Sequence, residues 1–181
     1  MTILYNDVIK FWFEDTTPEQ KWIKDPKFDA LIRKKFTDIH DKSIKGELSA
    51  WRLNAIGALA EIIILDQFSR NMYRGTKEAF ANDGLALKLA EEAIEKNYDK
   101  EIEKDYLSFL YMPFMHSESV NVHERALVLF NQEGLEDSYQ YELKHKVIID
   151  RFGRYPHRNE ILGRDSTPEE IVFLKGPDSS F

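Results

Sequence analysis

The chain has 181 residues, no cysteine and a formal net charge of −7. That length is typical of one domain with a sizeable core, and we expect residues 1–181 to form a single domain. The absence of cysteine excludes disulfide bonds, thiolate metal sites and a cysteine nucleophile. The negative charge argues against a nucleic-acid partner, because nucleic-acid binding depends on clustered lysine and arginine side chains.

The N-terminal sequence has no basic region ahead of an apolar stretch, so we expect no signal peptide. The longest apolar run covers residues 55–65, is interrupted by Glu61 and is too short to cross a bilayer. The sequence therefore predicts a soluble cytoplasmic protein that does not interact with a membrane.

Hydrophobic periodicity predicts helices throughout the first half of the chain. A short helix is expected at residues 3–13 and another at 26–43, where Pro26 suits the first helical turn. A third should run from about residue 49 to 74, and Gly75 should end it. Its first two-thirds are apolar on nearly every side, which is typical of a fully buried helix. We expect it to be the central element.

The second half continues the helical pattern. Thr76 is expected to cap a helix reaching residue 94, and Asp99 to begin one that Pro113 kinks or ends. Further helices are expected at residues 122–131, 137–152 and 156–163, and a capping box at residues 167–170 opens the last one. Because no hairpin signal interrupts them, the sequence predicts an all-α fold of eight or nine antiparallel helices around the buried central helix.

The first of three polar motifs covers residues 66–74. It places Asp66, Arg70 and Tyr73 on the angular sector that is apolar earlier in the same helix. Charges buried there need partners. Asp66 and Arg70, spaced i, i+4, therefore form a structural ion pair or line a pocket. Arg74 binds a ligand or rests at the negative end of the helix dipole.

The second motif, at residues 111–118, places a histidine and a glutamate after a proline. His116 is either a general acid or base oriented by Glu118, or a core histidine. Positions i and i+2 do not face each other on a regular helix, so the two share a ligand only if Pro113 breaks the geometry.

The third motif covers residues 151–159. Gly153 should end one helix and Pro156 begin the next, which puts His157, Arg158 and Asn159 in a first helical turn. That turn is electropositive and prefers acids, so cationic residues there break a local rule. Such conflicts are expected where function overrides stability.

An anion would resolve the conflict in the third motif. Arg154, Arg158 and His157, with the helix N-terminus, would then form a cradle for a carboxylate or a phosphate. Alternatively, Glu118 or Asp66 supplies the negative charge from within the protein.

The three remaining histidines are expected to have no part in a site. His145 falls on the apolar face of its helix and is interpreted as a core residue. His40 and His123 lie among polar residues and are expected to be exposed.

Six short runs carry a resemblance to a known family: FWF at 11–13, LDQFSRNMYRGT at 65–76, FAND at 80–83, YMPFMHSE at 111–118, RFGRYPHRN at 151–159 and ILGRDSTPEE at 161–170. Over about residues 7–175 the chain resembles a family of bacterial proteins known as a domain of unknown function. The resemblance implies an all-α fold similar to tetratricopeptide-repeat arrays, and it implies no activity. Ser69 stands where the family more often has proline, and Tyr155 where it usually has phenylalanine.

Two functions and one structural interpretation fit these motifs. In the first function, Arg154 and Arg158 clamp a small carboxylate or phosphate, Arg70 adds a third donor, and His116 or His157 exchanges a proton. Asn159, Arg74 and Tyr73 would complete the ligand contacts. In the second function, a basic groove holds an acidic peptide. In the structural interpretation, the motifs form a buried salt-bridge network.

Several common catalytic signatures do not occur in the sequence. There is no nucleophile elbow, no phosphate-binding glycine loop and no dinucleotide fingerprint. No HExxH pattern or pair of histidines on one helical turn is present either. We therefore expect no cofactor and no metal, and hydrolysis is the default reaction for an enzyme of this kind. The oligomeric state does not follow from the sequence.

Overall fold

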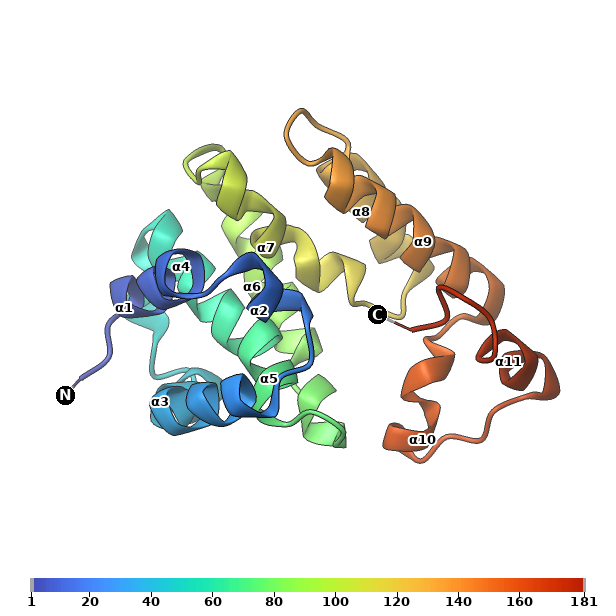
Figure 1. The fold of residues 1–181 in the computed structure, drawn as a ribbon. Helices are drawn as coiled ribbons and strands as arrows, with labels where there is room; N and C mark the ends of the chain where they lie inside the picture. The colour runs from blue at the N-terminus through green and yellow to red at the C-terminus, as the bar shows by residue number, and fades with distance from the viewer. Residues whose placement is uncertain (1, 181) are drawn as a thin grey trace. The chain divides into compact units, whose positions relative to one another are not determined.

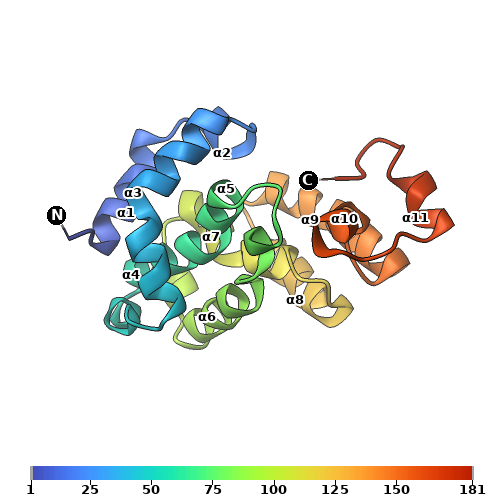
Figure 2. The same cartoon turned by 90° about the horizontal axis from the view of Figure 1, so that it is seen from below.

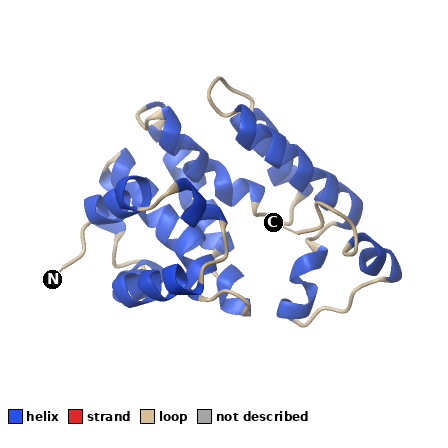
Figure 3. Ribbon diagram, in the orientation of Figure 1, coloured by secondary structure: helices blue, strands red, loops and turns tan. Residues whose placement is uncertain are grey.

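The computed structural model describes residues 2–180, and all regular structure in that range is helical (Figure 3). The chain divides into two compact units. The N-terminal unit comprises residues 1–74 and 78–113, and the C-terminal unit comprises residues 75–77 and 114–181. The predicted all-α class is confirmed, whereas the tetratricopeptide-like arrangement stays a prediction. No helix within the described range is long and apolar enough to span a membrane.

The N-terminal unit is organised around the segment predicted to be central. It consists of α4 (Ala55–Ile63), a π-helical turn η3 (Ile64–Phe68) and α5 (Ser69–Met72). The helices α1 (Tyr5–Lys10), α3 (Pro26–Ile44) and α6 (Asp83–Glu95) pack against this segment (Figure 1). Every residue from 59 to 65 is completely buried, so the predicted burial is confirmed.

The expected continuous helix from residue 49 is interrupted. A 3-10 turn, η2 (Ser49–Leu53), comes first, and Asn54 then adopts an extended conformation with its side chain accepting a hydrogen bond from the Gly57 amide at 2.9 Å. A Cβ atom on Gly57 would lie 2.1 Å from the Trp51 carbonyl oxygen, so the turn depends on glycine. The apolar pattern conceals this N-cap, because capping residues are short and leave periodicity unchanged.

Several other boundaries differ from the predicted ones. The helix α1 continues into a second π-helical turn, η1 (Phe11–Asp15), and is followed by the short α2 (Pro18–Trp22). Thr76 caps no α-helix, since the 3-10 turn η4 (Lys77–Phe80) intervenes before α6. Asp99 lies in the 3-10 turn η5 (Tyr98–Lys100), and α7 (Lys104–Met115) starts later. Pro113 lies inside α7, which ends two residues further on.

In the C-terminal unit, α8 (Val120–Phe130) and α9 (Glu136–Phe152) form an antiparallel pair, side by side in both views (Figures 1 and 2). Gly153 ends α9 with a left-handed φ of 66°. The turn η6 (Pro156–Arg158), α10 (Asn159–Leu162) and α11 (Pro168–Phe173) follow. The predicted capping box between Thr167 and Glu170 is confirmed.

Candidate functional site

The first predicted motif lies in the N-terminal unit and is part of a network that we call the central-helix network. Its carboxylates belong to Asp29, Asp66 and Asp83. Asp66, in the π-helical turn η3, is 1% exposed and lies 3.0 Å from Nη1 of Arg70. Arg70 also donates to both carboxylate oxygens of Asp83, at 3.0 and 3.1 Å. Arg70 therefore ties the central segment to α6.

A second arm of the central-helix network reaches α3. Arg74 donates to both oxygens of Asp29, at 2.6 and 2.9 Å, and the amide of Asn71 donates to the same carboxylate at 2.8 Å. Burial alone would raise the pKa of Asp29, but the hydrogen bonds from Arg74 and Asn71 outweigh it and hold the pKa below its usual value. Tyr73 is half-buried, with its ring 5.5 Å from that of His40.

His40 is 1% exposed, so its predicted exposure is wrong. Its Nε2 lies 2.8 Å from the buried Ser69 hydroxyl. Burial lowers the pKa of His40, which is therefore neutral at neutral pH. Polar sequence neighbours gave the wrong prediction because residue 40 falls on the face of α3 that covers the central segment.

The second and third motifs meet in the C-terminal unit, in a group of residues that we call the C-terminal network: Glu118, Arg154, Arg158, Asn159, Arg164 and Glu170. Glu118 accepts two hydrogen bonds from Arg164, at 2.7 and 2.9 Å, and one from the Tyr155 amide at 2.8 Å. Burial alone would raise the pKa of Glu118, but these donors hold it below its usual value. Glu118 is therefore ionised at neutral pH and suited to orienting a partner rather than donating a proton.

The second carboxylate of the C-terminal network belongs to Glu170. Arg154 donates to its two oxygens, at 2.6 and 2.8 Å, and also to the Asp165 carbonyl at 3.0 Å. The Arg154 hydrogen bond lowers the pKa of Glu170 to about 2. Asn159, 1% exposed, donates to Glu170 at 3.3 Å and accepts from Nε of Arg164 at 3.0 Å, so it links the two arginine–carboxylate pairs.

Arg158 and His157 occupy the turn η6. Arg158 is 6% exposed; it donates to the His116 carbonyl at 3.1 Å and lies 4.5 Å above the Tyr155 ring. Burial lowers the pKa of His157 to about 4, so this histidine is neutral at neutral pH. Its Nδ1 is buried and has no hydrogen-bond partner among the described residues.

His123 and Glu142 form a buried pair that sequence analysis missed. Both are 0% exposed, and His123 Nδ1 lies 2.6 Å from a carboxylate oxygen of Glu142. His123 Nε2 lies 2.8 Å from the Ser117 carbonyl, which only accepts, so Nε2 carries a proton. The pair therefore shares one further proton between Nδ1 and the carboxylate. The predicted exposure of His123 is wrong because its face of α8 packs against α9.

His145 is 6% exposed, in agreement with its predicted place in the core. Its Nδ1 donates to the Tyr141 carbonyl at 2.7 Å, and burial lowers its pKa to about 3. The ring of Tyr155 lies 5.7 Å from that of His145, 6.3 Å from that of His123 and 5.5 Å from that of His157, so these three histidines surround one tyrosine. His116 itself is half-buried.

The structure thus brings two of the three motifs together, and the first belongs to the other unit. The partners that sequence analysis missed are Asp29, Asp83, Glu142, Arg164 and Glu170. Three of them carried a signal: Asp83, Arg164 and Glu170 fall within the short runs that resemble the family. Asp29 and Glu142 lie outside those runs, and only their helical register places them on buried faces.

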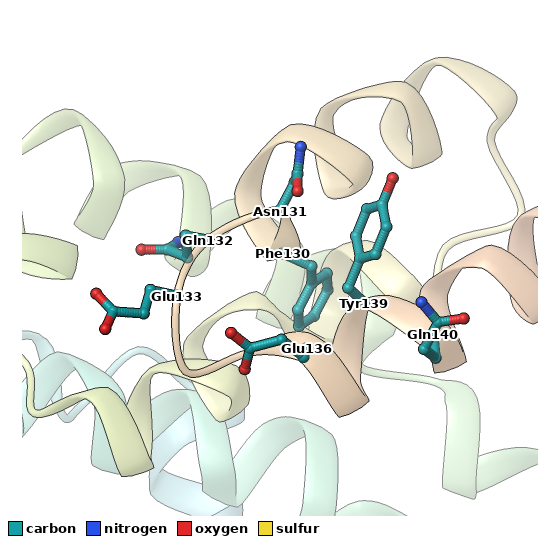
Figure 4. Close-up of a pocket in the computed structure, with 7 residues that line it drawn as sticks. All are labelled: Phe130, Asn131, Gln132, Glu133, Glu136, Tyr139 and Gln140. Atoms are coloured by element: carbon teal, nitrogen blue, oxygen red, sulfur yellow. The ribbon is translucent and has the colours of Figure 1, made fainter.

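One pocket of the C-terminal unit, of about 320 Å³, lies at the turn between α8 and α9 (Figure 4). It is lined by Phe130, Tyr139, Glu133, Glu136 and the amides of Asn131, Gln132 and Gln140. None of the predicted site residues belongs to this lining. Within residues 2–180, no group of three or more histidines and carboxylates is arranged to hold a metal ion.

Comparison with known proteins places the chain in a family. The model of a family described as "Bacterial protein of unknown function (DUF924)" matches residues 8–178. A solved structure of a protein of unknown function from Agrobacterium tumefaciens, ATU0120, is 38% identical and superimposes with a TM-score of 0.90. That match covers 95% of this chain and 97% of the other. Among curated proteins, no match was found.

Proposed function

This chain belongs to the DUF924 family of bacterial proteins of unknown function, and we propose that it binds a small anionic molecule, a carboxylate or a phosphate. The proposed site is the C-terminal network. Two of its arginines already hold carboxylates in bidentate geometry, the arrangement by which guanidinium groups recognise carboxylates and phosphates.

The observation that carries the proposal is an unused hydrogen-bonding group on Arg154. Its Nε and Nη2 atoms are used by Glu170 and the Asp165 carbonyl, whereas Nη1 has no acceptor among the described residues. The side chain is 28% exposed, and Nη1 is the part of the guanidinium that these contacts leave for a ligand. A fixed guanidinium binds an anion at lower entropic cost than a mobile one.

Other residues of the C-terminal network would support the ligand. Arg164 is 24% exposed and adds positive charge, and Arg158 adds a third guanidinium. A reaction at this site would use His116 or His157 to exchange a proton, with Glu118 orienting that histidine. Asp66, Arg70, Tyr73 and Arg74 lie in the N-terminal unit, and the proposal does not depend on them.

A second candidate function is recognition of an acidic peptide. It is favoured by the exposed face of α9, where Tyr141 is 55% and Val147 65% exposed. Lys144 lies between them; its ammonium is 5.8 Å from the Tyr141 ring and pairs with the exposed Asp178 at 3.2 Å, a partner that an acidic peptide would replace. Apolar side chains around a cation suit a segment that combines hydrophobic and acidic residues.

Thermal unfolding in the presence of inorganic phosphate, acetate, citrate and an acidic peptide tests both candidates. A ligand at a hundred times its dissociation constant stabilises by ~2.7 kcal/mol, a shift of roughly 5–10 °C for a chain of this size. The test variant is Arg154→Ala combined with Glu170→Gln, which removes the guanidinium without leaving a buried charge unpaired. The matched control is Arg151→Ala, because Arg151 pairs with an exposed glutamate, Glu169.

The proposal predicts that one small anion stabilises the wild type and the Arg151→Ala variant but not the double variant. Equal shifts in all three proteins would show a general salt effect and contradict it. A response to the acidic peptide alone would select the second candidate.

A further inference from the structure

The N-terminal unit contains a lysine surrounded by aromatic rings. Nζ of Lys21, in α2, lies 5.0 Å from the ring centre of Phe13, 5.7 Å from that of Phe109 and 5.8 Å from that of Trp12. All three distances fall within the range in which an ammonium ion is attracted to the negative face of a ring. Three rings around one cation constitute an aromatic cage.

The walls of this cage are fixed by the core. Trp12 is 0% and Phe109 5% exposed, and their rings meet edge to face with centres 5.8 Å apart. Phe13 contacts Phe109 at 5.3 Å and stacks on Tyr106 at 3.7 Å. Because these contacts do not involve Lys21, the cage would persist if the lysine left it.

The occupant is held only by the rings. No carboxylate among the described residues pairs with Lys21, and its half-burial lowers the pKa of the amine. Lys10, by contrast, pairs with Asp15 at 2.5 Å. An ammonium without a counter-charge is exchanged more readily for another cation than one held in a salt bridge.

The helix that carries Lys21 is weakly attached. None of the residues of α2 is buried: Trp22 stacks on Phe109, with ring centres 5.9 Å apart, but stays 62% exposed, and Ile23, just beyond it, is 60% exposed. The capping hydrogen bonds of α2 join Thr17 to Gln20 and are therefore internal to the segment. Segments with few buried contacts open at low free-energy cost.

Trp12, a wall of the cage, also carries an unused hydrogen-bond donor. The indole Nε1 of Trp12 is buried and has no acceptor among the described residues. A buried donor of this kind usually has a partner in a water or a ligand.

We infer that Trp12, Phe13 and Phe109 form a binding site for a small alkylated ammonium compound, that Lys21 occupies this site in the free protein, and that the compound displaces α2. The inference rests on a preformed aromatic cage that holds the ammonium of Lys21 without a pairing carboxylate. A quaternary ammonium fits such a cage better than a primary amine because it is more weakly hydrated. This site lies in the N-terminal unit and does not depend on the proposed anion site.

The test compares binding of tetramethylammonium and choline to wild type, Lys21→Ala and Lys35→Ala by calorimetry and by the indole N–H resonance of Trp12. Lys35 is the matched control, because its ammonium lies over two rings, Phe11 and Phe36, at 4.6 and 5.2 Å, outside the cage. Removing the resident cation should tighten binding roughly tenfold in Lys21→Ala relative to wild type. Lys35→Ala should bind as the wild type does.

A second measurement uses only the wild type. Tetramethylammonium chloride should accelerate proteolysis between residues 17 and 25 relative to sodium chloride at the same ionic strength. The inference is overturned if Lys21→Ala, shown to be folded by its thermal transition, binds neither compound. It is also overturned if Lys35→Ala gains as much affinity as Lys21→Ala, or if proteolysis of the wild type is unchanged.

Discussion

The two units of this protein share arginine–carboxylate networks but differ in their histidines. In the central-helix network of the N-terminal unit, Arg70 pairs with Asp66 of the same segment and with Asp83 of α6, and Arg74 pairs with Asp29 of α3. The C-terminal unit combines arginine–carboxylate pairs with four of the five histidines of the chain. Permanently charged pairs fasten helices over a wide pH range, whereas buried neutral histidines make stability depend on pH.

The networks also differ in what they connect. Arg70 and Arg74 link long helices through residues of the central segment, which contains the π-helical turn η3. Arg154 and Arg164 instead hold the non-helical stretches at residues 153–155 and 163–167, where backbone groups supply part of the contacts. Polar side chains on irregular backbone are typical of binding regions, so the difference favours the C-terminal network as the functional one.

The largest expected loss of stability comes from breaking the His123–Glu142 pair rather than any of the arginine–carboxylate pairs. Glu142→Ala should lower the free energy of unfolding by about 3–5 kcal/mol, because it leaves His123 completely buried without its partner. Urea unfolding measures this. Glu142→Gln, which keeps a hydrogen-bond acceptor, should cost less, and a loss below about 1 kcal/mol for the alanine variant would contradict the shared-proton pair.

A somewhat smaller effect is expected in the central-helix network. Arg70→Ala should destabilise by roughly 2–3 kcal/mol, since Asp66 is 1% exposed and loses its guanidinium partner, while Asp83 keeps access to water. The double variant Arg70→Ala with Asp66→Asn should recover part of the loss in the same urea experiment. If the double variant is no more stable than the single one, the unpaired carboxylate of Asp66 does not cause the loss of stability in Arg70→Ala.

Lowering the pH should affect the C-terminal unit more strongly, because the N-terminal unit holds one buried histidine, His40, and the C-terminal unit holds several. The pKa of His145 is about 3 in the folded protein and near 6.5 when unfolded, so between these values only the unfolded chain binds the proton. Its contribution to stability is complete above about pH 6.5 and declines by at most about 1.4 kcal/mol per pH unit as the pH falls toward 3. His157, with a pKa of about 4, acts in the same direction.

Hydrogen exchange at pH 7.5 and pH 5 measures this difference between the units. Amides of α8 and α9 should lose more protection than those of α4, and His145→Asn should reduce the loss. The carboxylates with lowered pKa values, Asp29 and Glu118, become relevant only below about pH 4.5. An equal loss of protection in both units at pH 5 would contradict the greater pH sensitivity of the C-terminal unit.

The smallest effect is expected at Arg151. This side chain is 50% exposed and pairs with Glu169, which is 63% exposed. Exposed pairs contribute little, so Arg151→Ala should change stability by less than about 0.5 kcal/mol. A loss comparable to that of the Arg70 variant would mean that exposure does not separate the structural arginines from the others.

Sequence periodicity predicted the helical class and the buried central segment because both depend on which side chains are apolar. The capping box at Thr167 and the glycine that ends α9 could also be predicted, since both depend on residues that are close in sequence. The break at Asn54 and the π-helical turns were not, because they arise from packing against other elements.

The candidate site could be predicted only in part from the sequence. The unusual cations of the turn η6 pointed to negatively charged partners, and Glu118 lies in the same network as Arg158. Which arginine holds which carboxylate depends on contacts such as that of Arg154 with Glu170, sixteen residues apart, and of Glu118 with Arg164, forty-six residues apart. Spacing along a single helix carries no information on contacts of this kind. Polar neighbours in sequence likewise gave no indication that His40 and His123 are buried.

The most direct test of an anion site in the C-terminal network is a titration with inorganic phosphate followed by two-dimensional NMR of backbone amides and arginine side chains. We expect saturable shifts at residues 153–164, at Glu118 and at the Nε–H of Arg154, with residues 66–74 unchanged. Shifts that do not saturate, or that appear equally in the central-helix network, would contradict an anion site in the C-terminal network. Both networks would then have only a structural role.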